Sequence, residues 1–320
     1  MKQSFSLPQG LYQSLILPPA WRSPIDWDEQ FGRPSFLTVE IGFGLGETLV
    51  DNAKTYPQRN FVGIEESIEH TQKALRLIER SNLPESNIRI LKCDCRVAFE
   101  RLFAENTIDQ IDCLFPCPWP KKRHNKHRLF SSDFLKLINS RLKQKAQVKI
   151  VTDYYPYFAW ILEETPNTGF ETTTNVVSPR YNTKYERKWQ AEGQREFFEI
   201  CLHKTSHIDR PLKKDVVLQA YKISQFNPQR FVLQNEKGPA AIIFKDFLFD
   251  EKHEAGLIYA IVSEEALTQH LRINISKSNQ AWHIVKADGQ YFFPTEGIAR
   301  ALQLVYEAAL ASSGASSLAN

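Results

Sequence analysis

Several features that would define a function class are missing from this 320-residue sequence. It contains no apolar run of the roughly 18 residues that a membrane-spanning helix requires, and its N-terminus lacks the apolar segment of a signal peptide. Its five cysteines form no C-x-x-C pair, which argues against a zinc site and favours free thiols. The net charge is only +3, so overall charge identifies no partner. These absences predict a cytoplasmic protein without a metal and without membrane contact.

The chain changes character along its length. Residues 1–34 are rich in proline and aromatic residues and predict an irregular N-terminal arm. From 35 to 204, apolar strand patterns alternate with amphipathic helix patterns, which predicts an α/β fold. Parallel neighbouring strands need crossover helices, so the expected architecture is a doubly wound, mostly parallel sheet. Residues 205–311 read as short strands followed by one helix, a C-terminal α+β module, and 312–320 as a disordered tail.

A glycine-rich turn joins the first strand of this domain to the following helix. Glu40 precedes Gly42, Gly44 and Gly46, and glycines at such a turn let the backbone approach a ligand closely. The spacing differs from the G-x-G-x-x-G dinucleotide fingerprint, and no P-loop lysine follows, so the turn does not indicate phosphate binding. Taken alone, the pattern is also consistent with a tight turn that binds nothing, because lone glycine patterns are weak evidence.

Two acidic residues after later strands favour a nucleoside site beside this turn. Glu65 ends the second strand, where a carboxylate can accept hydrogen bonds from ribose hydroxyls. Asp94, with Cys95 beside it, follows the third strand, where the adenine edge of a nucleoside is expected. In this order the features resemble the class I S-adenosylmethionine-dependent methyltransferases. The resemblance implies the Rossmann-like fold of that class and S-adenosylmethionine as the cofactor.

A basic loop follows the fourth strand. Pro116, Cys117, Pro118 and Trp119 begin it, and the basic side chains Lys121, Lys122, Arg123, Lys126 and Arg128 follow without an intervening acid. Such a loop on the ligand edge of the sheet can bind phosphates, and Trp119 can stack on an unpaired base. The alternative is a solvated loop without a ligand. We favour RNA or DNA contact.

Two later motifs complete a recognisable pattern. Thr152-Asp153 ends a strand, and Thr183-Lys184-Tyr185-Glu186 precedes the last strand of the domain. With P-x-P-W-P-K-K-R-H they resemble the bacterial tRNA (guanine-N7)-methyltransferases, which carry P-D-P-W-x-K-x-R-H, T-D and T-K-[FY]-E in this order. The resemblance covers roughly residues 35–203. It implies methyl transfer from S-adenosylmethionine to N7 of a variable-loop guanine in tRNA.

Roles for individual residues follow from the resemblance. Asp153 and Glu186 are expected to meet the target guanine, with Thr183 orienting the site and Lys184 contacting the substrate. The alternatives are that Asp153 caps a helix and that Glu186 pairs with Arg187 or Lys188 on the surface. The basic side chains of the loop are expected to contact phosphates, and Trp119 a base.

Cys117 departs from the family pattern, which has aspartate at this position. A carboxylate can accept hydrogen bonds from the N–H groups of guanine, whereas a thiol is a poor acceptor. Three alternatives remain: Asp153 and Glu186 suffice for catalysis, a Cys117 thiolate replaces the carboxylate, or catalysis is weakened.

Two rival functions therefore stay open. One is an RNA-binding protein that keeps the fold with weakened catalysis, and the other is a class I methyltransferase acting on another RNA or a small molecule. We expect the C-terminal module to have an auxiliary role in stability, dimerisation or a second contact with tRNA. The protein is expected to be a monomer or a homodimer.

Overall fold

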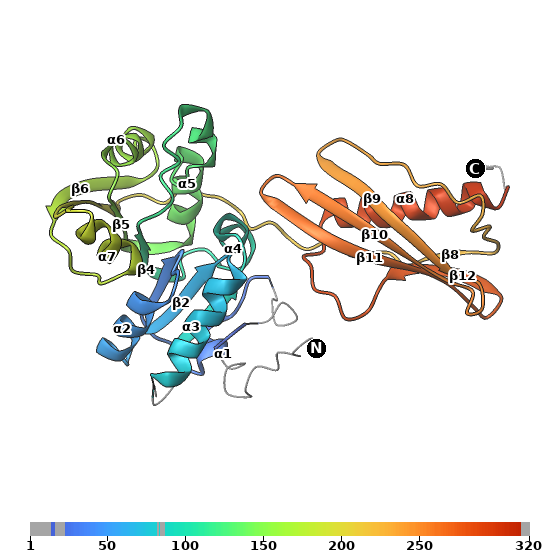
Figure 1. The fold of residues 1–320 in the computed structure, drawn as a ribbon, viewed down its shortest axis with the longest axis horizontal. Coiled ribbons are helices and arrows are strands. Elements are labelled where there is room, and N and C mark those ends of the chain that lie inside the picture. Colours follow the sequence, from blue (N-terminus) through green and yellow to red (C-terminus); the bar gives the residue numbers. More distant parts are fainter. Residues whose placement is uncertain (1–13, 17–22, 82, 84–86, 315–320) are drawn as a thin grey trace. The chain divides into compact units, whose positions relative to one another are not determined.

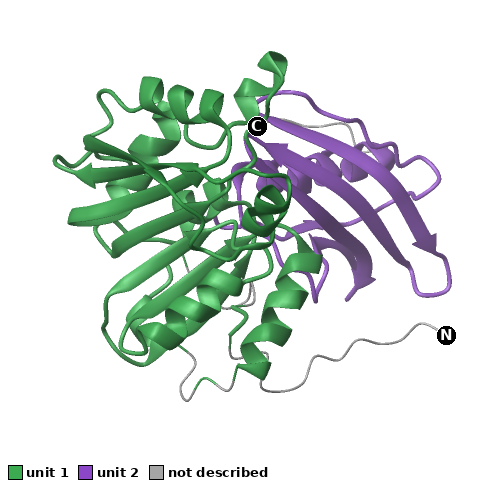
Figure 2. Ribbon diagram, turned by 60° about the vertical axis from the view of Figure 1, so that its left-hand side comes forward, with its two compact units in different colours: residues 1–213 green, residues 214–320 purple. Residues whose placement is uncertain are grey.

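The computed structural model describes residues 14–16, 23–81, 83 and 87–314 (Figure 1). The predicted N-terminal arm and the predicted tail fall partly outside this described part. The chain divides into two compact units, Met1–Lys213 and Lys214–Asn320, which are coloured separately in Figure 2. Among the described residues, no helix has the length and apolar character needed to cross a membrane.

The first unit is an α/β domain. Its helices are α1 (Trp27–Phe31), α2 (Glu47–Thr55), α3 (Ile68–Arg80), α4 (Cys95–Arg101), the 3₁₀ helix η3 (Lys122–His127), α5 (Ser132–Arg141), α6 (Tyr155–Glu164) and α7 (Lys184–Ala191). Its strands are β1 (Leu37–Ile41), β2 (Asn60–Glu65), β3 (Ile88–Lys92), β4 (Ile108–Leu114), β5 (Leu142–Thr152), β6 (Phe170–Val177) and β7 (Phe197–Lys204).

These seven strands form one sheet in the order β3-β2-β1-β4-β5-β7-β6. The first five strands in that order are parallel, and β7 runs antiparallel to both β5 and β6. The strands β1, β2 and β4 are largely buried, as their continuous apolar runs suggested. This confirms the predicted mostly parallel sheet with flanking helices.

Two local features of this unit differ from the sequence-based expectation. Helix α1 interrupts the predicted irregular arm, because the Asp26 side chain caps it by accepting a hydrogen bond from the Glu29 N–H. Strand β6 lies in the stretch before Thr183 that had no predicted structure, and its side chains are mostly exposed. An exposed strand of this kind carries a weak apolar signal.

The second unit is an antiparallel sheet with one helix. Strands β8 (Tyr221–Ile223), β9 (Ala240–Asp250), β10 (Ala255–Glu264), β11 (Leu267–Ser278) and β12 (Ala281–Lys286) pair in the order β8-β12-β11-β10-β9. Helix α8 (Glu296–Ser312) packs on the sheet through a core that includes Ile298, Leu302 and Val305. This is the predicted α+β module. The stretch 230–236, one of the short strands expected in this module, makes only an isolated bridge between Glu236 and Ile242.

The predicted limit after residue 204 lies before the observed division. The segment that follows β7 is bonded to the first unit, because Asn139 donates to the Ser206 carbonyl at 3.0 Å and accepts from the Ile208 N–H at 2.9 Å. Arg141, which is fully buried, donates to the Arg210 carbonyl at 2.7 Å. A linker pattern in the sequence therefore corresponds to ordered chain.

Candidate active site

The candidate site lies at the carboxyl ends of two adjacent parallel strands, β1 and β4. The strand order reverses between these two strands, with β2 beyond β1 and β5 beyond β4. Ligands of open α/β sheets bind at such a reversal. The glycine turn leaves β1 here, and the Pro116–Trp119 segment follows β4, so sheet topology brings together two motifs that are far apart in the sequence.

The glycine turn is held by its neighbouring strand. Gly42 donates its N–H to the Ile64 carbonyl at 2.8 Å, and Gly44 donates its N–H to Glu65 Oε2 at 3.0 Å. The other carboxylate oxygen of Glu65 accepts from the Ser67 N–H at 2.9 Å. Gly42 and Gly44 have φ values of 69° and 57°, a region that favours glycine. Glu65 thus fixes the shape of the turn as well as lining the site.

A cavity of about 350 Å³ opens beside this turn. It is lined by seven of the predicted residues: Gly42, Gly44, Glu65, Asp94, Cys95, Cys117 and Trp119. Asp94 Oδ1 also caps α4, accepting from the Arg96 N–H at 2.7 Å. The cavity volume falls within the usual range for small-molecule sites.

Gly46 has a different function in the fold. It is the N-cap residue directly before α2, with a φ of 81°, and a Cβ added there would lie 2.8 Å from the Ala74 Cβ. By contrast, a Cβ added at Gly42 or Gly44 meets no atom within 4 Å. Gly46 is therefore needed for helix packing, and the other two glycines leave open space for a ligand.

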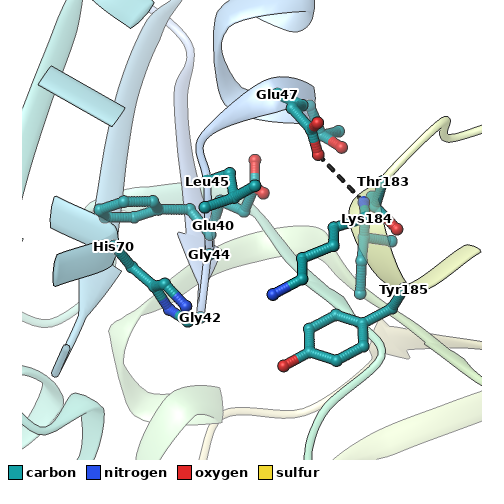
Figure 3. Close-up of a pocket in the computed structure, with 12 residues that line it drawn as sticks. Glu40, Gly42, Gly44, Leu45, Glu47, His70, Thr183, Lys184 and Tyr185 are labelled. Carbon is teal, nitrogen blue, oxygen red and sulfur yellow. Dashed lines mark hydrogen bonds between the residues drawn. The ribbon is translucent and has the colours of Figure 1, made fainter. Parts of the chain in front are cut away.

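Glu40 lines a narrow recess that shares Gly42, Gly44 and His70 with the cavity (Figure 3). The Glu40 side chain is buried, and burial together with the neighbouring Asp112 raises its pKa to about 8, although Lys149 opposes the shift. Asp112 is itself held by Lys149, with 3.4 Å between the Lys149 Nζ and Asp112 Oδ1. A protonated Glu40 can donate a hydrogen bond as well as accept one.

The segment Thr183–Glu186 is a helix-capping arrangement at the start of α7. The Thr183 hydroxyl accepts from the Glu186 N–H at 3.1 Å. The Glu186 carboxylate is 1% exposed and accepts from the backbone N–H groups of Arg180, at 2.8 Å, and Asn182. These contacts resemble a capping box, in which N-cap and N3 side chains satisfy free N–H groups. Lys184, Thr183 and Tyr185 line the recess, whereas Glu186 does not line it.

Glu47 is a residue of the site that the sequence reasoning missed. Its Oε2 accepts from the Lys184 N–H at 3.0 Å, drawn as a dashed line in Figure 3, and its Oε1 accepts from Arg187 Nη2 at 2.6 Å. It therefore ties the first turn of α2 to the first turn of α7. An acidic residue directly after the last glycine is a weak local signal, because acids are common at helix N-termini.

The basic loop divides into an exposed part and a buried part. Lys121, Lys122, Arg123 and Lys126 are exposed in or beside η3. Arg128 is only 6% exposed. It donates from Nε to the Pro118 carbonyl at 3.1 Å and lies over the rings of Tyr157 and Trp160. Arg128 thus anchors the loop. The sequence predicted that it would contact phosphate from the loop surface, but its side chain is buried.

The Trp119 ring is supported by two histidines. Its centroid lies 5.0 Å from that of His127 and 5.8 Å from that of His124. Both Phe115 and Trp119 have left-handed φ values, 55° and 45°. Non-glycine residues adopt this conformation at an energetic cost and are frequent at functional sites.

Asp153 and Cys117 have contrasting positions. Asp153 is half-buried, does not line the cavity, and has its carbonyl bonded to Gln194 Nε2 at 3.0 Å. Burial raises the pKa of its carboxyl group, and Lys188 opposes the shift. Cys117 is exposed and lines the cavity. Of these two predicted catalytic residues, only Cys117 faces the cavity.

Comparison with known proteins identifies the family to which the chain belongs. A family model described as "Putative methyltransferase" matches residues 34–199, which contain the glycine turn, the basic loop and Glu186. The chain belongs to this methyltransferase family. The match ends within β7, so the antiparallel second unit lies outside it.

Relatives of this methyltransferase carry the name tRNA (guanine-N(7)-)-methyltransferase. The protein from Chlorobium phaeobacteroides is 42% identical over 173 residues, 54% of this chain and 84% of its own length. The protein from Thermotoga maritima is 30% identical over 297 residues, 89% of this chain and 93% of its own. The protein from Thermus thermophilus is 32% identical over 80% of this chain and 83% of its own. The Thermotoga match necessarily includes much of the second unit.

Proposed function

We propose that this methyltransferase transfers a methyl group from S-adenosylmethionine to N7 of a guanine in tRNA, at the variable loop. The observation that carries the proposal is the convergence at one sheet reversal of a glycine-lined cavity and an exposed basic loop. The Thermotoga maritima relative, whose match covers 89% of this chain and so includes both motifs, carries the corresponding name.

The residues present fit a nucleoside cofactor. Gly42 and Gly44 leave open space at the cavity wall, and the carboxylates of Glu65 and Asp94 line the same cavity. Carboxylates at the ends of the second and third strands suit ribose hydroxyls and an amino-bearing base edge. We assign these four residues to cofactor binding, with Cys95 lining the same cavity and Glu40 lining the adjoining recess.

The bound cofactor supplies an electrophilic methyl group on a sulfonium. Guanine N7 has a lone pair and no proton, so its methylation would require no residue to remove a proton. The protein therefore acts by alignment and electrostatics. Glu186 is buried, and we therefore assign it a positioning role. It orders the segment that carries Thr183, Lys184 and Tyr185.

The exposed lysines and arginine of the loop supply affinity for the phosphate backbone. Lys121, Lys122, Arg123 and Lys126 are free of acidic neighbours in the sequence, and Trp119 lies where the loop meets the cavity. Electrostatic contacts of this kind do not select a base, so the shape of the tRNA and the cavity select the guanine.

A second candidate function rests on Cys117. A thiol occupies the cavity wall where the related sequence pattern has a carboxylate, which favours an RNA-binding protein with weakened catalysis. The two functions differ in one product, 7-methylguanosine.

Nucleoside mass spectrometry of total tRNA, with and without the gene, tests both. We expect 7-methylguanosine to disappear from the deletion strain and to return when the gene is restored. Unchanged 7-methylguanosine, together with retained tRNA binding by the purified protein, would favour the RNA-binding function. A different methylated nucleoside that disappears would assign another substrate.

A further inference from the structure

Three aromatic side chains of the first unit form a cluster where strand β5 ends. Tyr155 and Phe158 lie on α6, and Phe198 is the second residue of β7. The centroid of the Phe198 ring lies 5.3 Å from that of Tyr155 and 5.3 Å from that of Phe158. The Tyr155 and Phe158 centroids are 5.8 Å apart. These separations are those of aromatic rings in contact, and we call the three residues the aromatic patch.

The aromatic patch is open to solvent, although its members are large side chains that usually bury most of their area. Tyr155 is 58% exposed, and Phe158 and Phe198 are half-buried. Val176 pairs with Phe198 in the register of β6 and β7, so its side chain extends the same face, and it is also 58% exposed. Exposed apolar side chains that are in contact with one another, unlike scattered ones, mark an interaction site.

The position of the patch relates it to the candidate site. Phe198 pairs with Thr152, the last residue of β5, and Tyr155 follows Asp153 by two residues. Strand β5 lies next to β4, whose carboxyl end leads to Trp119 at the cavity. Neighbouring strands are about 4.8 Å apart, so β7 lies about 10 Å from β4. A base close in sequence to a guanine at the cavity can therefore reach the patch.

The basic loop contacts the other side of helix α6. Arg128 lies over the rings of Tyr157 and Trp160, and the Leu129 N–H donates to the Tyr157 hydroxyl at 3.2 Å. Since successive helical residues are about 100° apart, Tyr157 points away from Tyr155. One helix thus lies between the loop that carries the positive charges and the patch. An RNA bound to the loop and to the cavity has the patch within reach.

We propose that the aromatic patch stacks an unpaired base of the tRNA substrate, close in sequence to the guanine that is methylated. This inference rests on the proposed function and adds a second base contact to it. The patch is uncharged and offers phosphate groups no ionic contact, whereas the flat face of a tyrosine ring suits a nucleobase. Stacking tolerates any base, so the patch holds the strand while the cavity selects the guanine.

Binding of an unmodified tRNA transcript to the full-length protein tests the contact. We expect Tyr155→Ala to raise the dissociation constant at least about fivefold, because one stacked base is lost. The slope of log affinity against log salt should not change, since no phosphate contact is removed. Tyr155→Trp should keep the affinity, because tryptophan also stacks. Tyr56→Ala is the control, since Tyr56 is 39% exposed at the far end of α2, and it should leave binding unchanged.

Abasic substitutions in the tRNA identify the stacked base. Each unpaired nucleotide that flanks the target guanine is replaced in turn by an abasic residue. We expect one of these tRNAs to bind the unsubstituted protein as weakly as intact tRNA binds Tyr155→Ala. The same tRNA should lose no further affinity with that variant. Such a double-mutant cycle isolates the contact between the ring and the base.

The remaining outcomes overturn the inference. Unchanged affinity in Tyr155→Ala excludes stacking, and a shallower salt slope would assign a backbone contact instead. A lower melting temperature without rescue by Tyr155→Trp would make the role of the ring structural. A loss that persists in every abasic tRNA rejects a flanking base as the partner. Unchanged tRNA affinity with an altered mass in ultracentrifugation would identify a protein interface.

The proposed function is judged by a separate measurement. It fails if the unsubstituted protein forms no 7-methylguanosine in tRNA, whatever the binding of the Tyr155 variants. The stacking inference fails if that product forms and Tyr155→Ala binds tRNA as the unsubstituted protein does.

Discussion

The Glu65 carboxylate accepts a hydrogen bond from the Gly44 N–H at 3.0 Å and thereby joins the end of β2 to the glycine turn after β1. The same carboxylate lines the cavity. One side chain thus shapes the turn and presents an acceptor to the ligand. A substitution at Glu65 affects both properties.

Glu65→Ala should weaken binding of S-adenosylmethionine by about 1–3 kcal/mol, because the variant lacks an acceptor for hydrogen-bonding groups of the ligand. Isothermal titration calorimetry measures this change. Glu69→Ala is a suitable control, since Glu69 pairs with Lys73 on the exposed surface of α3. Equal affinities of Glu65→Ala and the unsubstituted protein would remove Glu65 from the binding site.

The basic loop should control the salt dependence of tRNA binding. Replacing Lys121, Lys122, Arg123 and Lys126 by glutamine should lower the slope of log affinity against log salt by about 0.7–0.9 for each phosphate group that the loop no longer binds. Filter binding across a salt series measures the slope. Arg128→Gln should instead lower the melting temperature, because Arg128 is buried against aromatic rings. An unchanged slope in the quadruple variant would identify the loop as solvated surface.

Cys117 can be tested by exchange for the family residue. If a carboxylate at the cavity wall assists the guanine, Cys117→Asp should raise single-turnover methyl transfer severalfold, while Cys117→Ser should change it little. If a thiolate acts in place of the carboxylate, Cys117→Ser should abolish transfer and alkylation should inactivate the natural protein. We expect the first outcome, in which Cys117→Ser changes methyl transfer little. Loss of activity in the serine variant would contradict this expectation and indicate a thiolate.

The end of the first unit can be located by truncation. A fragment ending at Lys213 should fold and bind cofactor, whereas one ending at Lys204 removes partners of the buried Asn139 and Arg141. Leaving these groups unsatisfied should lower the melting temperature by at least about 4 °C. Differential scanning calorimetry of both fragments makes the comparison. Equal melting temperatures of the two fragments would show that the first unit ends at residue 204.

Glu40 should make stability depend on pH. Its pKa is about 8 in the folded protein against an ordinary value of 4.5, so the folded state holds this proton more tightly than the unfolded state. The free energy of unfolding should therefore fall as the pH rises through this interval. Glu40→Gln keeps a neutral side chain and should show a smaller fall between about pH 5 and about pH 8 in urea titrations. The same slope in both proteins would contradict the assignment to Glu40.

Much of the fold could be predicted because its signals are local. Apolar runs, glycines and amphipathic periods report the conformations of neighbouring residues, which is sufficient for β1, α2, β2 and α3. The spacing from the glycine turn to Glu65 follows from one helix and one strand. Strand β6 was missed because most of its side chains are exposed and lack an apolar alternation.

Burial was the property that local signals could not determine. Arg128 and Glu186 are charged residues of the kind usually found on the surface, yet both are buried. Long-range packing places Arg128 over aromatic rings and Glu186 against backbone N–H groups. The capping role of Glu186 had a local signal, its position three residues after Thr183. Arg128 had none, because Tyr157 and Trp160 lie on a later helix.

The family motifs, the parallel α/β architecture and the residue types available for a nucleoside and for phosphates all follow from the sequence. Which of these residues share a cavity depends on how the strands are ordered in space. Glu65, Asp94 and Cys117 converge because β1 lies between β2 and β4 in the sheet, and their strands end at the same edge. Asp153 remains outside that cavity, although its strand β5 is the next one along. Strand order and burial arise from contacts between distant segments, and these carry no signature in any single stretch of sequence.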